Sequence, residues 1–280
     1  MNAQNRSKAE RFKTHPKSKI QNRFGVQVIS QKAFRYCLVS VLLVVSLLAS
    51  GDNSNARGAK GKLRVLFIGN SLTYVNDLPA IVGALAEASG QGPFIHKSVA
   101  YPDLSLEDHW NRGDAQRAIA GEKWDVVVLQ QGPSGLEESR KLLLEYTRLF
   151  AKEIRSSGAK PALYMVWPSQ ARFKDFDRVV ESYKLAADDV KAILFPVGQA
   201  WRHAWKSDPD IALYSEDKFH PSIAGSYLAA LVIYEKLFAA SPVGLPAHLK
   251  LRSKTPGEID LGKEQARLLQ VAASEANKNF

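Results

Sequence analysis

Short apolar runs rich in β-branched residues alternate with longer amphipathic stretches through most of this chain, and no other feature constrains the fold as strongly. Each run is bounded by Gly, Pro or polar residues, which is typical of buried parallel strands. The five runs cover residues 63–69, 93–100, 124–130, 161–167 and 192–197. The amphipathic stretches predict helices over residues 77–89, 104–120, 136–157, 175–189, 222–240 and 258–275.

Strands that alternate with helices predict an α/β protein, here a three-layer α/β/α sandwich around a five-stranded parallel sheet. In such sheets, ligands bind beyond the carboxyl ends of the strands. Three distant segments follow predicted strand ends: Gly69-Asn70-Ser71, Gln130-Gln131-Gly132 and Trp167-Pro168. We therefore expect these segments to line one crevice.

The first 56 residues differ in composition from the rest of the chain. They hold nine basic and two acidic residues, +7 of the net charge of +10, so residues 57–280 carry only +3. Thirteen uncharged residues, 37–49, follow the basic segment. A membrane span needs about 20 apolar residues, whereas this length suits the h-region of a signal peptide. Ser54-Asn55-Ala56 then offers small residues for cleavage near Ala56.

This pattern predicts two parts: a basic leader with a signal peptide over residues 1–56, and one folded domain over residues 57–280. The protein would then be periplasmic or secreted. The alternative is an uncleaved N-terminal anchor, through which alone the protein would contact a membrane.

Composition also excludes several function classes. Because the positive charge is concentrated in the leader, the basic balance does not indicate a nucleic-acid partner. The only cysteine, Cys37, lies in the apolar run, so the domain has no disulfide, no cysteine-based metal site and no cysteine nucleophile. No glycine-rich nucleotide-binding loop occurs. The sequence leaves the oligomeric state open.

Ser71 is the first candidate for chemistry. It follows a predicted buried strand through Gly69 and Asn70, and a helix begins soon after it. A serine at such a strand end faces the crevice, and a hydroxyl nucleophile needs this exposure together with a base. The alternative is a turn serine that caps its own backbone.

Asp217 and His220 form the second candidate feature. Three residues apart on one turn, the carboxylate can bond one imidazole nitrogen and leave the other free to face a hydroxyl. Pro221 then leads into an apolar helix. The alternative is a surface loop whose Asp and His face water.

Together these two features resemble the GDSL/SGNH hydrolases. Ile68-Gly69-Asn70-Ser71-Leu72-Thr73 is similar to their first block, with Asn in place of the usual Asp, and Asp217-x-x-His220-Pro221 is similar to their last block. The resemblance implies a flavodoxin-like SGNH hydrolase fold, with no metal and no organic cofactor. It also implies that Ser71 attacks an ester carbonyl, that His220 accepts its proton and that Asp217 orients His220. The products would be an acid and an alcohol, by way of an acyl-enzyme.

The middle blocks of the family pattern are absent. The family supplies oxyanion donors from a Gly after the second strand and an Asn after the third, whereas this chain has no Gly in 99–105 and reads Gln130-Gln131 after the third. Either glutamine could donate through its side-chain amide, and the alternative is strand-end hydrogen bonding to neighbouring loops. The backbone N–H of Ser71 would be a further donor. Asn70 is grouped with the two glutamines as an oxyanion or substrate-binding candidate, and we expect its side-chain hydrogen bonds to hold the nucleophile loop.

The sequence therefore favours an exported serine esterase that acts on small acyl groups, with O-acetyl groups on glycans as one substrate class. The alternatives are a non-catalytic carbohydrate-binding protein and an acyltransferase on the same fold. Two further residues have a more ordinary interpretation. We expect His109 to be a surface or capping histidine, and Trp167 to pack the sheet edge rather than stack on a sugar.

The leader generates a prediction of its own. If residues 1–56 are a cleaved leader, N-terminal sequencing of the exported protein should begin at or close to Arg57. A membrane-bound protein that keeps residues 1–56 would contradict cleavage and would favour the anchor.

Overall fold

The computed structural model describes residues 61–253 and 257–280, and the predictions for the leader, residues 37–49 and the cleavage site lie outside the described residues. Five parallel strands form the main sheet: β1 Leu63–Gly69, β2 Phe94–Ala100, β3 Val126–Leu129, β4 Lys160–Tyr164 and β5 Ile193–Phe195. Their order in the sheet is β2-β1-β3-β4-β5, and all four pairings are parallel. This is the flavodoxin-like order, which confirms the predicted fold class.

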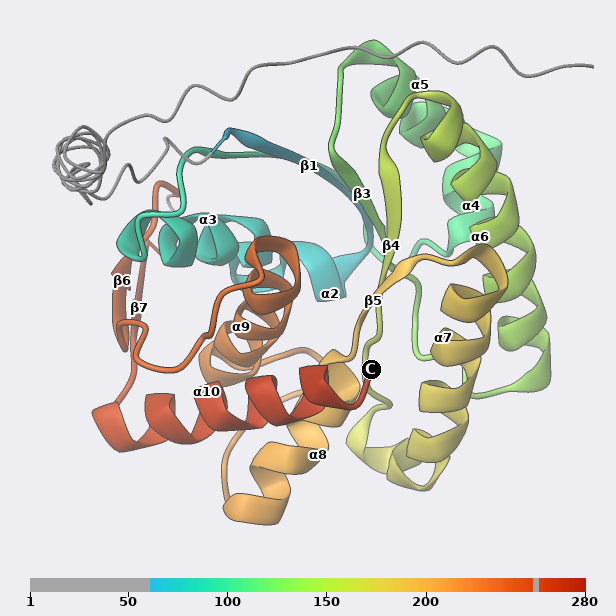
Figure 1. Cartoon of the computed structure of the whole chain (residues 1–280). Coiled ribbons are helices and arrows are strands. Elements are labelled where there is room, and N and C mark those ends of the chain that lie inside the picture. The colour runs from blue at the N-terminus through green and yellow to red at the C-terminus, as the bar shows by residue number, and fades with distance from the viewer. Residues whose placement is uncertain (1–60, 254–256) are drawn as a thin grey trace, which may run out of the picture. The chain divides into compact units, whose positions relative to one another are not determined.

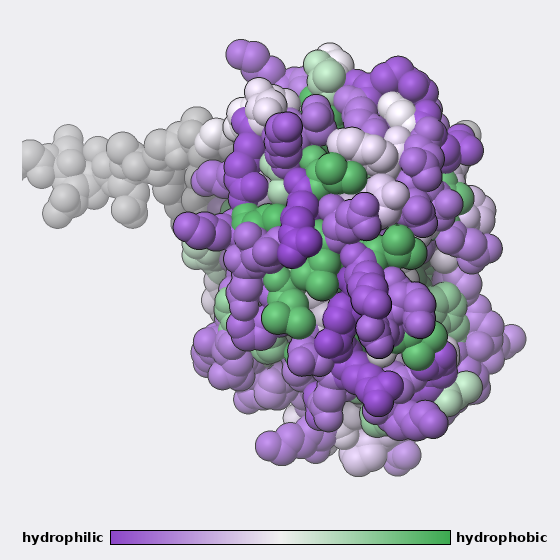
Figure 2. Space-filling model, turned by 90° about the vertical axis from the view of Figure 1, so that its right-hand side faces the viewer, coloured by the Kyte–Doolittle hydropathy of each residue, from purple (hydrophilic) through white to green (hydrophobic). Residues whose placement is uncertain are grey.

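Helices cover both faces of the sheet (Figure 1). One layer contains α3 Leu78–Ala88, α8 Val197–Ser207, α9 Ile223–Phe238 and α10 Lys263–Lys278, which contact one another. The other contains α4 Leu106–Arg112, α5 Asp114–Gly121, α6 Glu137–Ser156 and α7 Phe176–Val190. Figure 2, which looks onto this second layer, shows a largely hydrophilic surface broken by apolar patches. The centre of the sheet is buried, since Val127, Val128 and Leu163 are at most 1% exposed.

Local signals explain several of the helix boundaries. Asp77 caps α3 by accepting a hydrogen bond from Ala80 N, and Pro79 lies in the first turn, as predicted. The predicted helix over 104–120 is instead two helices, because Gly113 adopts a left-handed backbone (φ 77°) that ends α4. Ser105 begins α4 with a capping box to Asp108.

The sequence prediction missed several elements. Helix α8 was not predicted, and the predicted helix over 258–275 begins later, at Lys263, because Glu258–Asp260 forms strand β7. That strand pairs antiparallel with β6 (His248–Lys250) in a separate two-stranded sheet. Among the residues that the structure describes, no helix is long and apolar enough to cross a membrane.

The start of α9 is packed closely against the loop that precedes the Asp217–His220 turn. A Cβ added at Gly225 would lie 2.3 Å from the carbonyl oxygen of Leu213 and 2.7 Å from the Trp201 ring. Only glycine allows this approach, because the opposing oxygen belongs to the backbone and cannot move alone. The contact therefore fixes where the chain enters α9, directly after His220 and Pro221.

We predict that Gly225→Ala lowers the free energy of unfolding by about 1–3 kcal/mol, because it overpacks this contact. Gly121→Ala is the matched control, since a Cβ there meets nothing within 4 Å, and it should change stability by less than about 1 kcal/mol. Urea unfolding of both variants measures the difference. Equal stabilities would show that the contact at Gly225 does not constrain the fold.

Candidate active site

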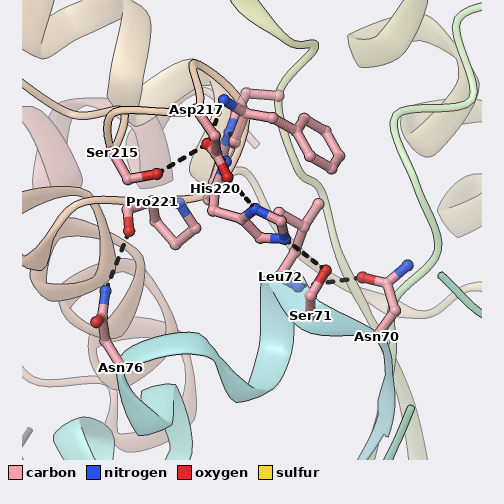
Figure 3. A network of polar contacts seen from close by, with 10 residues as sticks. Asn70, Ser71, Leu72, Asn76, Ser215, Asp217, His220 and Pro221 are labelled. Carbon is pink, nitrogen blue, oxygen red and sulfur yellow. Dashed lines mark hydrogen bonds and ion pairs between the residues drawn. The ribbon is translucent and has the colours of Figure 1, made fainter. Parts of the chain in front are cut away.

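Ser71 lies at the carboxyl end of β1, as the first residue of the short helix α2 (Ser71–Tyr74). Asn70 caps this helix, because its side-chain oxygen accepts a hydrogen bond from Leu72 N at 3.1 Å. The turn directs the Ser71 hydroxyl toward the loop before α9 (Figure 3). The residue is only 6% exposed, so its hydroxyl is accessible only from a restricted direction.

His220 lies within hydrogen-bonding distance of Ser71, although 149 residues separate them. Its Nε2 is 2.8 Å from Ser71 Oγ, and its Nδ1 is 2.5 Å from Asp217 Oδ2 (Figure 3). The carboxylate can only accept, so Nδ1 carries the proton and Nε2 is left to accept from the hydroxyl. The three predicted residues thus form the geometry of a serine–histidine–aspartate triad.

The hydrogen-bond donors around Asp217 keep its side chain ionised. The hydrogen bond to His220 has the largest effect in lowering the pKa of Asp217 well below its usual range, and Phe219 N, Ser215 Oγ and His220 N assist it. Burial opposes these bonds but does not outweigh them. Oδ1 accepts from both backbone N–H groups at 2.9 Å and from Ser215 Oγ at 2.8 Å. Asp217 therefore has the charge and the orientation needed to fix the imidazole.

Asn76 connects the two halves of the site, and the sequence analysis did not identify it. Its Nδ2 donates to Pro221 O at 3.1 Å and to Ser226 Oγ at 3.0 Å, so the segment after Ser71 is tied to the residue after His220 (Figure 3). Asn76 has a left-handed backbone (φ 57°), a conformation that Asn tolerates better than most residues. The Asn-Asp pair at 76–77 was the only sequence signal for this turn.

A buried amide network holds the turn that carries Ser71, residues 69–73. Gln130 Oε1 accepts from Asn70 N at 2.9 Å and from Thr73 Oγ1 at 2.7 Å. Gln130 Nε2 donates to Asn70 Oδ1 at 2.9 Å and to the carbonyl of Gln131 at 2.8 Å. The predicted role of Asn70 in holding the loop agrees with these bonds, since Asn70 Nδ2 also donates to Leu104 O.

Gln131 is similarly engaged. Its Nε2 donates to Ser134 Oγ and to Ser139 O, and its Oε1 accepts from Leu106 N at 3.1 Å. Because both amide hydrogens of each glutamine are used in this way, neither side chain has a donor left for an oxyanion. The contacts of Gln130 and Gln131 thus match the alternative of strand-end bonding to loops rather than the oxyanion role.

His109 is not the surface or capping residue that the sequence suggested. It is fully buried, and its Nε2 lies 2.8 Å from the carbonyl oxygen of Gly69, two residues before Ser71. The carbonyl can only accept, so Nε2 carries the proton. Burial has the largest effect in lowering the pKa of His109, although the bond to Gly69 opposes it. A neutral histidine thus supports the end of β1.

Trp167 has the packing role that the sequence favoured. It is fully buried, its ring stacks on Trp201 with centroids 3.6 Å apart, and its Nε1 donates to Phe219 O at 3.0 Å. This bond holds the backbone next to His220. No group of three or more His, Cys, Asp or Glu side chains among the described residues could hold a metal ion.

A cavity of about 540 Å³ opens beside Ser71, and we call it the catalytic cavity. All three predicted crevice segments contribute to it, through Asn70, Ser71, Gln131, Gly132 and Pro168, which confirms that they converge. Its apolar wall includes Leu104, Leu136, Leu142, Val179 and Phe219, and its polar lining includes Ser105, Ser134, Ser139, Ser169, Arg172 and Asp175. The volume is within the range of small-molecule sites, about 300–1,000 Å³.

Comparison with solved structures shows which proteins share this fold. A protein from Slackia heliotrinireducens described as an SGNH hydrolase is 31% identical, over 63% of this chain and 100% of that protein, with a TM-score of 0.53. A DUF4886 family protein from Bacteroides uniformis is 22% identical, over 77% and 95%, with a TM-score of 0.63. An acetyl xylan esterase is 15% identical, over 62% and 98%, with a TM-score of 0.50.

No protein-family model and no curated protein matches the sequence. The Slackia protein is matched over its whole length at an identity that indicates common ancestry, whereas the other two matches show the fold alone. The chain belongs to the SGNH hydrolase superfamily, in a divergent branch.

We predict that Asn76→Asp lowers kcat by roughly 10- to 100-fold with little change in KM, because loss of the donor to Pro221 releases the His220 loop. Asp retains the size and turn preference of Asn. Ser226→Ala is the control, since it removes the other acceptor and leaves the bond to Pro221 intact. Steady-state kinetics on a short ester measures both, and equal kcat values would exclude a positioning role for Asn76.

Burial of His109 also predicts how stability depends on pH. The pKa of His109 is lower in the folded protein than in the unfolded chain. As the pH falls below about 6.5, the unfolded chain therefore takes up a proton on His109 before the folded protein does. The contribution of His109 to the free energy of unfolding is fully present above that pH and is lost as the pH falls. His109→Phe should therefore show a smaller loss of unfolding free energy between about pH 7 and pH 5 than the wild type. Urea unfolding at several pH values measures this slope, and equal slopes would contradict it.

Proposed function

We propose that this protein is an exported serine esterase that removes small acyl groups, such as O-acetyl groups, from glycans through an acyl-enzyme on Ser71. The observation that carries the proposal is the pair of contacts at His220, 2.8 Å to Ser71 Oγ and 2.5 Å to Asp217 Oδ2. Membership of the SGNH hydrolase superfamily supports hydrolysis as the reaction class.

The geometry suits a two-step reaction. Ser71 Oγ attacks the ester carbonyl carbon while His220 Nε2 takes the hydroxyl proton, and the Asp217 carboxylate stabilises the imidazolium. Collapse of the tetrahedral intermediate breaks the bond to the alcohol oxygen, which receives the proton from His220. A water molecule then attacks the acyl-enzyme with His220 as base, which releases the acid and restores Ser71.

The oxyanion must be stabilised by backbone donors, because both glutamine amides are used elsewhere. Among the described residues, no hydrogen bond engages the backbone N–H of Ser71 or of Leu104, and both residues line the catalytic cavity. Donors of this kind are worth about 2.7–4 kcal/mol each in the transition state. Leu104 would thus replace the family's glycine after the second strand.

The substrate class follows from the lining of the catalytic cavity. Serine oxygens, which can accept hydrogen bonds, and the Arg172–Asp175 ion pair, with 2.6 Å between its charged atoms, can bond the hydroxyl groups of a sugar, while the apolar wall accommodates the acyl group. An acetyl xylan esterase shares the fold, which is consistent with this class. The export that the leader predicts would give the enzyme access to extracellular or envelope glycans.

We predict that Ser71→Ala abolishes hydrolysis of 4-nitrophenyl acetate, and that Asp217→Asn lowers kcat by roughly 10²–10⁴-fold because it removes the charge that fixes the imidazole. Thermal unfolding of the variants serves as the control for folding. Wild-type activity in Ser71→Ala would refute the assignment. A wild type that binds glycans but cleaves no ester would favour the non-catalytic alternative, and transfer of the acyl group to an added alcohol would favour the acyltransferase.

A further inference from the structure

A second cavity of about 490 Å³ lies next to the catalytic cavity, and we call it the aromatic cavity. Its lining includes three rings, Phe173, Trp205 and Tyr214, and three polar side chains, Gln170, Asp210 and Lys218. None of these residues has a role in the triad. The segment from Asp217 to His220, which we call the catalytic loop, nonetheless contributes to both cavities, because Lys218 lines the aromatic cavity and Phe219 lines the catalytic cavity.

One short 3₁₀-helix, η2 (Gln170–Asp175), separates the two cavities. Residues three apart on such a helix lie on the same side. Arg172 and Asp175 line the catalytic cavity, whereas Gln170 and Phe173 line the aromatic cavity. The backbone N–H of Gln170 donates to Lys218 O at 2.9 Å, which joins η2 to the catalytic loop. Helix η2 and the loop that contains Lys218 therefore form the ridge between the two cavities.

The rings of the aromatic cavity are held in fixed positions. Tyr214 donates its hydroxyl to Pro168 O at 2.6 Å, and Trp205 Nε1 donates to Ile211 O at 3.2 Å. Trp205 also packs against Tyr214 and Phe173, with centroids 5.5 and 5.6 Å apart. Phe173 is nevertheless 49% exposed, and the other two rings are half-buried. Because the polar atoms of Tyr214 and Trp205 are already bonded, the cavity presents ring surface.

The polar side chains around these rings are available to a ligand. Within residues 61–253 and 257–280, no hydrogen bond or ion pair engages the side chains of Gln170, Asp210 or Lys218, and all three are exposed. Together they offer amide, carboxylate and ammonium groups, and thus both donors and acceptors. Rigid exposed rings bordered by such groups match the two surfaces of a sugar: the C–H groups of its faces and the hydroxyl groups at its edge.

We infer that the aromatic cavity is a subsite for a sugar ring in the alcohol part of the ester, in a glycan chain that crosses the η2 ridge from the catalytic cavity. This inference rests on the proposed esterase function, because the sugar ring belongs to the alcohol that cleavage of the ester would release. A small aryl ester ends within the catalytic cavity and gains nothing from the rings. An acetylated oligosaccharide extends over the ridge and contacts Phe173.

The test compares two substrates, 4-nitrophenyl acetate and chemically O-acetylated xylotetraose or chitotetraose. For Phe173→Ala, the ratio of kcat/KM on the oligosaccharide to kcat/KM on the aryl ester should fall about three- to tenfold, the value of one aromatic contact. The fall should come mainly from KM. Gln170→Ala should lower the same ratio by a smaller factor. Leu185→Ala, an exposed residue on α7 that lines neither cavity, should leave the ratio unchanged.

A binding measurement separates this subsite from the esterase function. Tryptophan fluorescence of the wild type should change saturably with unmodified xylotetraose or chitotetraose, and Phe173→Ala should need a higher concentration for half-saturation. If the aryl ester is cleaved but Phe173→Ala matches the wild type in both ratio and binding, the subsite is refuted and the esterase stands. If no ester is cleaved, binding alone decides: weaker binding by Phe173→Ala supports the subsite, and unchanged or undetectable binding overturns it.

Discussion

The parallel sheet is the constraint on which the site depends. All five strands run in the same direction, so the loops that follow β1, β3 and β4 meet at one edge, where Ser71, Gln131 and Pro168 line the same cavity. In this arrangement the Ser71 hydroxyl at the end of β1 meets the His220 imidazole before α9. The close packing of Gly225 against Leu213 then sets where the histidine loop lies.

Hydrogen bonds between buried amides and backbone supply the rest of the order at the site. Gln130 is hydrogen-bonded to Asn70 and Thr73 on either side of Ser71 and to the carbonyl of Gln131, and His109 is hydrogen-bonded to the carbonyl of Gly69. A buried donor or acceptor that lost its hydrogen-bond partner here would cost about 1–3 kcal/mol. The network is therefore a rigid base for Ser71, while the side chains of Asp217 and His220 are partly exposed.

Part of this arrangement was predictable from the sequence. The strand-like apolar runs predicted the five-stranded sheet, and the residues at their ends predicted the crevice, because both depend on local patterns. The break at Gly113, the short strands β6 and β7, and helix α8 were missed, because short elements are set by packing rather than by periodicity. Gln130, Asn76 and His109 were misread or unnoticed for a related reason. Their bonds join segments from 40 to 145 residues apart, which spacing cannot reveal.

The central claim is that Ser71 is a nucleophile activated by His220. Its most direct measurement is covalent labelling with a fluorophosphonate, followed by peptide mapping by mass spectrometry. We expect one phosphonyl group on Ser71 in the wild type, far slower labelling in His220→Ala and none in Ser71→Ala. A folded wild-type protein that stays unlabelled, or that carries the label on another residue, would contradict the claim.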